Sequence, residues 1–316
     1  MKLNELRPIQ KETFSGTYRL TGRVASFDDE GIPYVKMRLS SCNADVVVLA
    51  AVETVVIPER LGHMELVEVK GRVCVGPEEG VILLTDIRRP FRLDVIRLPA
   101  LQTLPRTLCP RPEDLDQLVE SVRSLESDHL KMCIKRVLER RDRLEVFLRA
   151  PASTHYHHNY PGGLLVHSLE VARGVVSMTQ IHEPDMPRSL QELGFVAGLL
   201  HDIGKTYTYD EKGRPTATAR LCSHDALTLE ACAYGLAHLE TVDPEAALTL
   251  RHIWTCASPG ARYGIPAAMT LARYVRDADG QSAMADNQRR AFKRRELKGF
   301  GKLGQNTYWL PALEAR

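Results

Sequence analysis

The sequence contains no run of about 18 consecutive apolar residues, so we expect no membrane-spanning helix. Its first seven residues, MKLNELR, are charged and lack the apolar centre of a secretory signal peptide. It also lacks an excess of one charge, because 42 basic and 40 acidic side chains leave a net charge of +2. This balance excludes a protein that binds nucleic acid through its overall charge, although a local basic patch stays open.

The seven cysteines are odd in number, and no two are spaced Cys-x-x-Cys. This pattern argues against a disulfide framework and against a structural zinc cage made of thiolates. A chain of 316 residues with 44% hydrophobic residues is long enough to bury a core without disulfides. We therefore expect a protein of the reducing cytoplasm with about two domains.

Five short β-rich runs lie within residues 17–88, and turn residues such as Asp28-Asp29-Glu30-Gly31 separate them. They predict a five-stranded barrel of the OB type, with an SH3-like barrel as the alternative. The runs are 17–24, 34–40, 45–50, 66–73 and 81–84.

Prolines are dense between residues 90 and 112, which favours a linker over a helix or a central strand. From residue 112 apolar residues recur every three and four positions, as in amphipathic helices, and no comparable strand pattern follows residue 150. The predicted fold is therefore multidomain, with a β-barrel followed by an all-α domain. The predicted segments are 1–90 (barrel), 91–111 (linker), 112–287 (helical domain) and 288–316 (tail).

The predicted tail is rich in Lys and Arg. A solvated helix face is the simpler interpretation, and a contact surface for nucleic acid is the alternative. Its basic residues are Arg289, Arg290, Lys293, Arg294, Arg295 and Lys298.

Histidine is concentrated in one window, because nine of the eleven histidines lie between residues 155 and 252. Within it, His201-Asp202 ends an apolar stretch that is predicted to be helical, and Ile203-Gly204-Lys205 follows. Near the end of a helix an adjacent His and Asp can reach the same metal ion. Histidine is also the commonest metal ligand.

Two further segments extend this pattern. Gly162-Gly163-Leu164-Leu165-Val166-His167 places a histidine in the first turn of another predicted helix, and Asp279 follows a third apolar stretch. Side chains from three helices would then form a mixed nitrogen and oxygen site. Such a donor set suits Mn²⁺, and also Mg²⁺ or Fe²⁺, better than a thiolate zinc cage does.

The pattern His167 … His201-Asp202 … Asp279 resembles the HD phosphohydrolase superfamily. In that family these positions ligate divalent metal, and a metal-activated water attacks phosphorus. A barrel followed by this domain is similar to the YhaM-type 3′–5′ exoribonucleases. Those enzymes have a His-His pair where this chain has Ala257-Ser258, so one or two ions are both compatible with the sequence.

The resemblance implies a metal-dependent phosphodiesterase that degrades single-stranded RNA, or DNA, from its 3′ end, with single-stranded nucleic acid as the partner and no membrane. Homo-oligomerisation stays open. A rival function is that of a DNA-processing protein of a mobile element, because the motif also resembles the TraI/MobH relaxases. A nucleotide phosphohydrolase and a non-catalytic module that binds nucleic acid are two further candidates.

The expected roles follow from the resemblance and from side-chain chemistry. Asp202 and Lys205 are the candidate catalytic residues, and Lys205 could hold a phosphate oxygen. His157 and His158 are expected chiefly as hydrogen-bond partners of the ligands. The candidate metal ligands are His167, His201, Asp202, Asp279, His224 and His252. The candidate substrate-binding residues are Lys205, Arg262, Tyr263, Tyr34, Lys36 and Arg38.

Overall fold

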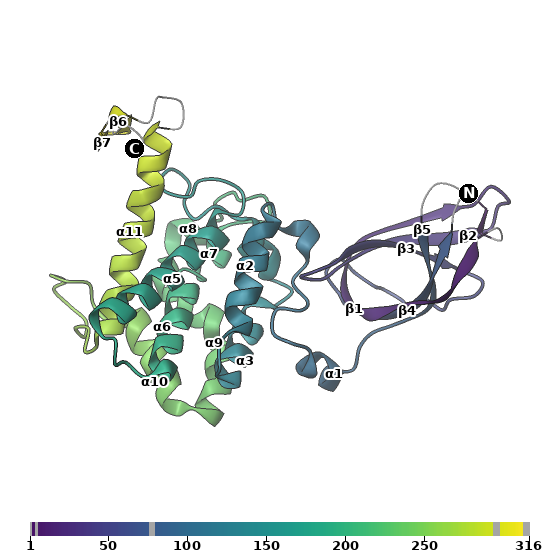
Figure 1. The fold of residues 1–316 in the computed structure, drawn as a ribbon, viewed down its shortest axis with the longest axis horizontal. Helices are drawn as coiled ribbons and strands as arrows, with labels where there is room; N and C mark the ends of the chain where they lie inside the picture. Colours follow the sequence, from purple (N-terminus) through teal and green to yellow (C-terminus); the bar gives the residue numbers. More distant parts are fainter. Residues whose placement is uncertain (1, 4–5, 76–79, 293–297, 312–316) are drawn as a thin grey trace, which may run out of the picture. The chain divides into compact units, whose positions relative to one another are not determined.

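The computed structural model describes residues 2–3, 6–75, 80–292 and 298–311, and the chain divides into two compact units, Met1–Arg123 and Ser124–Arg316 (Figure 1). The first unit contains a closed five-stranded barrel and the second is mainly helical. The predicted fold class is confirmed. Among the described residues, no helix is both long and apolar enough to span a membrane.

The barrel has the strand order β1-β2-β3-β5-β4, and β4 closes it by pairing with β1. Neighbouring strands are antiparallel except β3 and β5, which run parallel. All five predicted runs lie within observed strands. The strands are β1 (Arg7–Phe27), β2 (Pro33–Ser40), β3 (Asp45–Ala51), β4 (Leu66–Val75) and β5 (Gly80–Arg88).

Alternation along each strand fills the barrel. On β2, Val35, Met37 and Leu39 are buried in the barrel core, whereas Lys36 and Arg38 between them are exposed. This is the period of two that a strand with one buried face requires. The barrel therefore closes around aliphatic side chains and leaves its outer surface polar at these positions.

The predicted linker is not an extended spacer. It contains a short helix, α1 (Arg92–Arg97), and a 3-10 turn, η2 (Arg106–Leu108). The prolines at 90 and 99 flank α1 and do not interrupt it, which is why the helix can form. Buried Arg19 of the barrel donates a 2.9 Å hydrogen bond to the carbonyl of Thr103, so this segment packs onto the barrel.

The first unit also includes helix α2 (Pro112–Arg123), so its boundary lies after Arg123 and not at the predicted residue 112. Arg106 forms an ion pair with both carboxylate oxygens of Asp116 on α2. These contacts tie the helix to the segment that precedes it.

The second unit is built around α5, α6 and α11, and α9 packs against α3 and α10. Small residues allow the three central helices to approach closely. A Cβ at Gly198 of α6 would lie 2.9 Å from the Ala172 backbone on α5, and one at Gly174 would lie 3.0 Å from Ala278 on α11. The helices are α3 (Asp128–Leu138), α4 (Leu144–Arg149), α5 (Gly163–His182), α6 (Arg188–Leu200), α7 (Lys205–Thr208), α8 (Thr218–Leu221), α9 (His224–Val242), α10 (Pro244–Thr255) and α11 (Thr270–Phe292).

The region predicted as a basic tail has structure. Helix α11 continues through Arg289 and Arg290 to Phe292, and two strands follow it, β6 (Gly299–Leu303) and β7 (Asn306–Leu310). No strand was expected after residue 150, so this hairpin, which lies within the predicted tail 288–316, corrects that expectation. Lys293, Arg294 and Arg295 lie outside the described residues.

Candidate metal centre

Three helices position the four residues of the sequence motif. The paired glycines allow α5 to begin, because Gly162 has a φ of 80° and a Cβ on Gly163 would lie 2.0 Å from the His158 carbonyl oxygen. This start places His167 in the second turn of α5. His201 and Asp202 directly follow α6, and Asp279 lies in the middle of α11.

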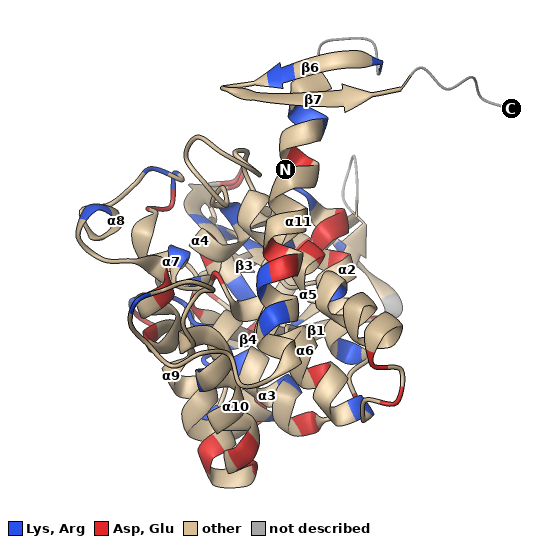
Figure 2. Ribbon diagram, turned by 90° about the vertical axis from the view of Figure 1, so that its left-hand side faces the viewer, with Lys and Arg blue, Asp and Glu red and all other residues tan. Residues whose placement is uncertain are grey.

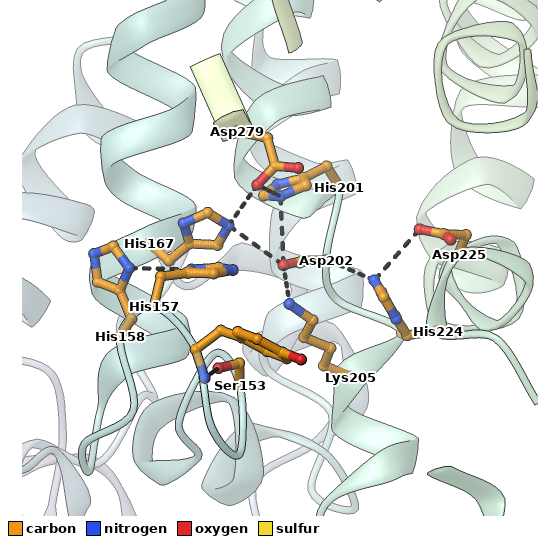
Figure 3. A network of polar contacts seen from close by, with 12 residues as sticks. Ser153, His157, His158, His167, His201, Asp202, Lys205, His224, Asp225 and Asp279 are labelled. Atoms are coloured by element: carbon orange, nitrogen blue, oxygen red, sulfur yellow. Dashed lines mark hydrogen bonds and ion pairs between the residues drawn. The ribbon is translucent and has the colours of Figure 1, made fainter. Parts of the chain in front are cut away.

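The four side chains converge at the centre of Figure 3. Nε2 of His167 lies 3.1 Å from Oδ1 of Asp279 and 3.4 Å from Oδ2 of Asp202. Nε2 of His201 lies 3.4 Å from the same Asp202 oxygen and 3.8 Å from Oδ1 of Asp279. Ligand atoms of His167, His201 and Asp202 all lie within 4.8 Å of one another. The structure thus brings together the residues that the motif predicts.

The hydrogen bonds of His167 define its tautomer. Ser282 donates its hydroxyl proton to Oε2 of Glu170 at 2.6 Å, so its oxygen is left to accept from Nδ1 of His167 at 3.0 Å. Nδ1 of the neutral ring therefore carries the proton, and Nε2 presents a lone pair to the carboxylates.

The tautomer of His201 is likewise defined by a hydrogen bond at Nδ1. Its Nδ1 lies 2.7 Å from the carbonyl oxygen of Gly198, which can only accept, so Nδ1 donates and Nε2 presents a lone pair. Among the described residues, neither Nε2 atom has a hydrogen-bond partner, although both are buried. Two buried nitrogens that face two carboxylates favour a positive charge between them, and the mixed nitrogen and oxygen donors fit a divalent metal ion.

The electrostatics of the cluster agree with this interpretation. Burial opposes ionisation of Asp202, yet the Lys205 ammonium and the neighbouring imidazoles of His201, His167 and His224 outweigh it, so the pKa of Asp202 lies well below its usual range. Burial also opposes a charge on His167, but Asp202 and Asp279 raise its pKa above the ordinary value. The cluster thus attracts positive charge to Nε2 of His167, and a metal ion can take the place of the proton.

Lys205 lies beside the cluster on α7. Its Nζ donates a 2.5 Å hydrogen bond to Oδ2 of Asp202, and the side chain is largely buried. Its ammonium group therefore adds a fixed positive charge next to the carboxylate that both histidines face. This position suits a group that stabilises negative charge on a substrate.

His224 and His252 differ in their placement. His224, at the start of α9, approaches the other oxygen of Asp202, with Nε2 3.1 Å from Oδ1. The hydrogen bond that His224 donates to the Asp202 carboxylate raises the pKa of His224 against the effect of burial. His252 on α10 instead uses its Nε2 to accept a 2.9 Å hydrogen bond from the backbone of Ala268. His224 is thus placed to extend the site, and the structure does not bring His252 into it.

His157 and His158 lie beside His167, and the three form a second group of potential ligand atoms within 4.8 Å of one another. His158 donates from Nε2 to Glu170 at 3.1 Å, so its Nδ1 can accept from Nδ1 of His157 at 3.3 Å. Burial and the neighbouring His167 and Lys205 side chains lower the pKa of His157 to about 4. His157 is therefore neutral at pH 7, with its Nε2 lone pair available to an ion.

The predicted substrate-binding residues outside the cluster have varied surroundings. Arg262 packs over the ring of Tyr263 on an exposed loop, and neither belongs to the two groups of potential ligands. On the barrel, Tyr34, Lys36 and Arg38 share the outer face of β2, but the guanidinium of Arg38 is bound to both carboxylate oxygens of Asp45. Arg38 is thus less accessible to phosphate than its sequence suggested.

Sequence reasoning missed the residues that position His167. Glu170 lies three residues after His167, and Ser282 lies three residues after Asp279, so each shares a helix face with a motif residue. Buried Asp286 continues that face of α11 and accepts a 2.6 Å hydrogen bond from the His158 backbone. Polar residues at this spacing beside a motif residue were the signal that could have found them.

Two family models match parts of the chain. The model described as "HD domain" matches residues 164–284, which include all four motif residues, and the TraI_2 model, described as "Putative helicase", matches residues 105–210. A 3′-5′ exoribonuclease YhaM from Shouchella clausii is 25% identical over 158 residues, which are 49% of this chain and 47% of that protein.

A dihydroneopterin 2′,3′-cyclic phosphate phosphodiesterase from Methanocaldococcus jannaschii is 39% identical over 64 residues, 20% of this chain and 26% of that protein. The chain therefore spans about half or less of the length of the curated relatives that it matches. No solved structure matches the chain at a significant level.

Proposed function

Because residues 164–284 match the HD domain, we propose that the chain is a metal-dependent phosphodiesterase that removes nucleotides from the 3′ end of single-stranded RNA. The hydrolase class is supported by the domain and by both relatives, whose names describe a phosphodiesterase and an exoribonuclease. The direction and the RNA substrate are suggested by the YhaM relative.

One observation carries the metal-dependent part of this proposal: the two buried Nε2 lone pairs of His167 and His201 that face Asp202 and Asp279 without a hydrogen bond. The mixed nitrogen and oxygen donors favour Mn²⁺, with Mg²⁺ or Fe²⁺ as alternatives. The candidate ligands for a second ion are His224, which approaches Oδ1 of Asp202, and His157.

Each residue has a defined task in this mechanism. His167, His201, Asp202 and Asp279 would hold the ion, and Ser282 and Gly198 keep the two imidazoles in the tautomer that ligation requires. When bound here, a divalent ion would lower the pKa of a water molecule and neutralise phosphate charge. Lys205 would stabilise the negative charge that develops on the phosphoryl oxygens.

The barrel would supply binding of the polymer. Five-stranded barrels of the OB type bind single strands through stacking rings and a basic groove. The outer face of β2 carries Tyr34 and Lys36, which offer a ring and a charge to such a strand. A substrate of one nucleotide has no need of this additional surface, so the barrel favours a polymer.

The test uses single-stranded RNA and DNA of equal sequence, labelled at the 5′ end, with the purified protein and Mn²⁺. We expect an RNA ladder that shortens from the 3′ end and that His201→Ala/Asp202→Ala abolishes. The matched control is His182→Ala/Asp185→Ala, which replaces an exposed His and Asp outside the cluster and should leave the ladder unchanged. Intact RNA with the wild-type protein would contradict the proposal.

Two matches favour specific second candidates. The match of residues 105–210 to the TraI_2 model favours a protein that processes DNA, and faster cleavage of the DNA arm would support it. The archaeal relative favours a small 2′,3′-cyclic phosphate as substrate. Hydrolysis of a 2′,3′-cyclic nucleotide with no shortening of either polymer would establish that activity instead.

A further inference from the structure

Strands β6 and β7 form a small hairpin at the end of α11 (Figure 2). The pairing of Leu303 with Asn306 leaves a two-residue loop, and its first residue, Gly304, has a φ of 58°. Glycine is favoured at this place in a tight hairpin turn. A lone two-stranded hairpin is marginally stable, so the packing of this one on α11 matters.

The two faces of the hairpin differ. On the inner face a Cβ at Gly301 would lie 2.9 Å from the ring of Phe292, which is buried at the end of α11. On the outer face Phe300 and Trp309 pair across the strands, with ring centroids 4.6 Å apart. They are 67% and 56% exposed. The inner face therefore anchors the hairpin, and the outer aromatic pair contributes little to burial.

The sequence that contains the hairpin is rich in basic residues. Residues 289–310 include seven Lys or Arg and one Glu, whereas the net charge of the whole chain is +2. Lys302 lies on the outer face, two residues from Phe300, and is exposed. Lys302 is the basic residue of β6 (blue in Figure 2), and the strand has no acidic one. Two exposed rings within a segment of net positive charge are typical of a surface that binds the bases and phosphates of an unpaired strand.

We propose that the outer face of this hairpin, formed by Phe300, Lys302 and Trp309, binds single-stranded RNA by base stacking. This inference rests on the proposed function, because the strand bound here is the substrate of the metal centre. An apolar protein partner would not require the positive charge, and a duplex would not expose its bases to the rings.

The position of the hairpin gives this binding site a length dependence. Asp279 and Phe292 are thirteen residues apart on α11, which corresponds to about 20 Å along the helix. A nucleotide advances a strand by roughly 3–6 Å, so a strand of more than about six nucleotides can reach both the metal centre and the hairpin. Short substrates would contact the metal centre alone.

The experiment measures RNA binding by the full chain in EDTA, so that the result does not depend on cleavage. A labelled 20-nucleotide RNA reports affinity by fluorescence anisotropy. We expect Phe300→Ala/Trp309→Ala to weaken binding about tenfold or more, since loss of stacking typically costs that much. Trp309→Phe should retain most of the affinity. Tyr234→Ala, which removes an exposed ring from α9, should have no effect.

A second readout separates this inference from the proposed function. With Mn²⁺, the hairpin variant should hydrolyse bis(p-nitrophenyl) phosphate at the wild-type rate, because that substrate is too small to reach the hairpin. If the wild-type protein hydrolyses nothing, the proposed function is wrong. The binding measurement in EDTA then still tests whether the hairpin binds RNA.

Three results would overturn the inference. The first is unchanged RNA affinity in Phe300→Ala/Trp309→Ala. If that variant also converts a dimer into a monomer in analytical sedimentation, the face is a contact between two copies of the chain. The second is equal affinity for duplex RNA. The third is tighter binding of single-stranded DNA of the same sequence, which would make DNA the occupant.

Discussion

Nε2 of His167 lies 3.1 Å from Oδ1 of Asp279, and yet the buried imidazole nitrogen makes no hydrogen bond within the described part of the chain. The reason is the other side of the ring, where Ser282 fixes the proton on Nδ1. A lone pair therefore faces a carboxylate across a gap that a divalent ion fits. Helices α5 and α11 therefore each contribute a side chain that would bind the ion.

The first prediction concerns Asp279 and its neighbour Asp277. Asp279→Asn should lower Mn²⁺-dependent hydrolysis by more than about 100-fold, because loss of a ligand costs more than loss of a residue that positions one. Asp277→Asn is the matched control, since Asp277 is exposed and lies two residues away on the same helix. Steady-state rates with bis(p-nitrophenyl) phosphate measure both. Equal losses in the two variants would contradict the assignment of Asp279.

The second prediction concerns the hydroxyl that holds His167. Ser282→Ala removes the acceptor for Nδ1 and should weaken Mn²⁺ affinity about 10–100-fold. Ser168→Ala serves as control, because Ser168 is also buried but its hydroxyl has no hydrogen-bond partner among the described residues. Calorimetric titration with Mn²⁺ compares the two. If they bind with the same affinity, the tautomer argument is wrong.

Lys205 provides the third prediction, in which binding and catalysis respond in opposite directions. Lys205→Gln removes a charge 2.5 Å from Asp202, so Mn²⁺ should bind at least as tightly as before. The turnover number should nevertheless fall by about 100–1,000-fold, as when a donor to a developing oxyanion is lost. Lys212→Gln, at an exposed lysine in a loop, should change neither quantity. A rate loss that excess metal restores would assign Lys205 to metal binding instead.

The fourth prediction is a pH dependence of stability. Although burial opposes its ionisation, the hydrogen bonds from His158 and Ser282 lower the pKa of Glu170 to about 2, from an ordinary value of 4.5. A carboxylate with a lowered pKa stabilises the folded state above about pH 4.5, and this stabilisation is lost as the pH falls towards 2. The difference in the free energy of unfolding between wild type and Glu170→Gln should therefore shrink between pH 5 and pH 2. Urea unfolding at several pH values measures it, and a difference that does not change with pH would contradict the prediction.

The sequence predicted the parts of this molecule that depend on local patterns. Alternation such as that of Val35, Met37 and Leu39 identified the barrel strands, and the motif around His201 identified a cluster on three helices. The hairpin also carries a local signal, because Gly304-Gln305 separates two short runs with aromatic residues. These runs are too short to stand out against the helical pattern that precedes them.

Other features depend on tertiary contacts that no spacing reveals. In the sequence, His252 and His224 were equally good candidates for metal ligands. Only the packing of α10 shows that Nε2 of His252 accepts a hydrogen bond from the backbone of Ala268. In the sequence, Arg38 was likewise a candidate for binding phosphate. The pairing of β2 with β3 places Asp45 beside it, and the two side chains form an ion pair. The sequence predicted a linker after Arg88. Its packing onto the barrel was not predictable, because the contacts involve residues distant in the sequence, such as Arg19.

The metal centre depends on His167, His201, Asp202 and Asp279 holding a divalent ion. The most direct measurement is a Mn²⁺ titration in which the electron paramagnetic resonance signal of the free ion is recorded for the wild type, for His201→Ala/Asp202→Ala and for His182→Ala/Asp185→Ala. We expect the wild type and the second variant to bind one or two ions per chain and the first variant to lose this binding. Equal Mn²⁺ binding by all three proteins would contradict the assignment.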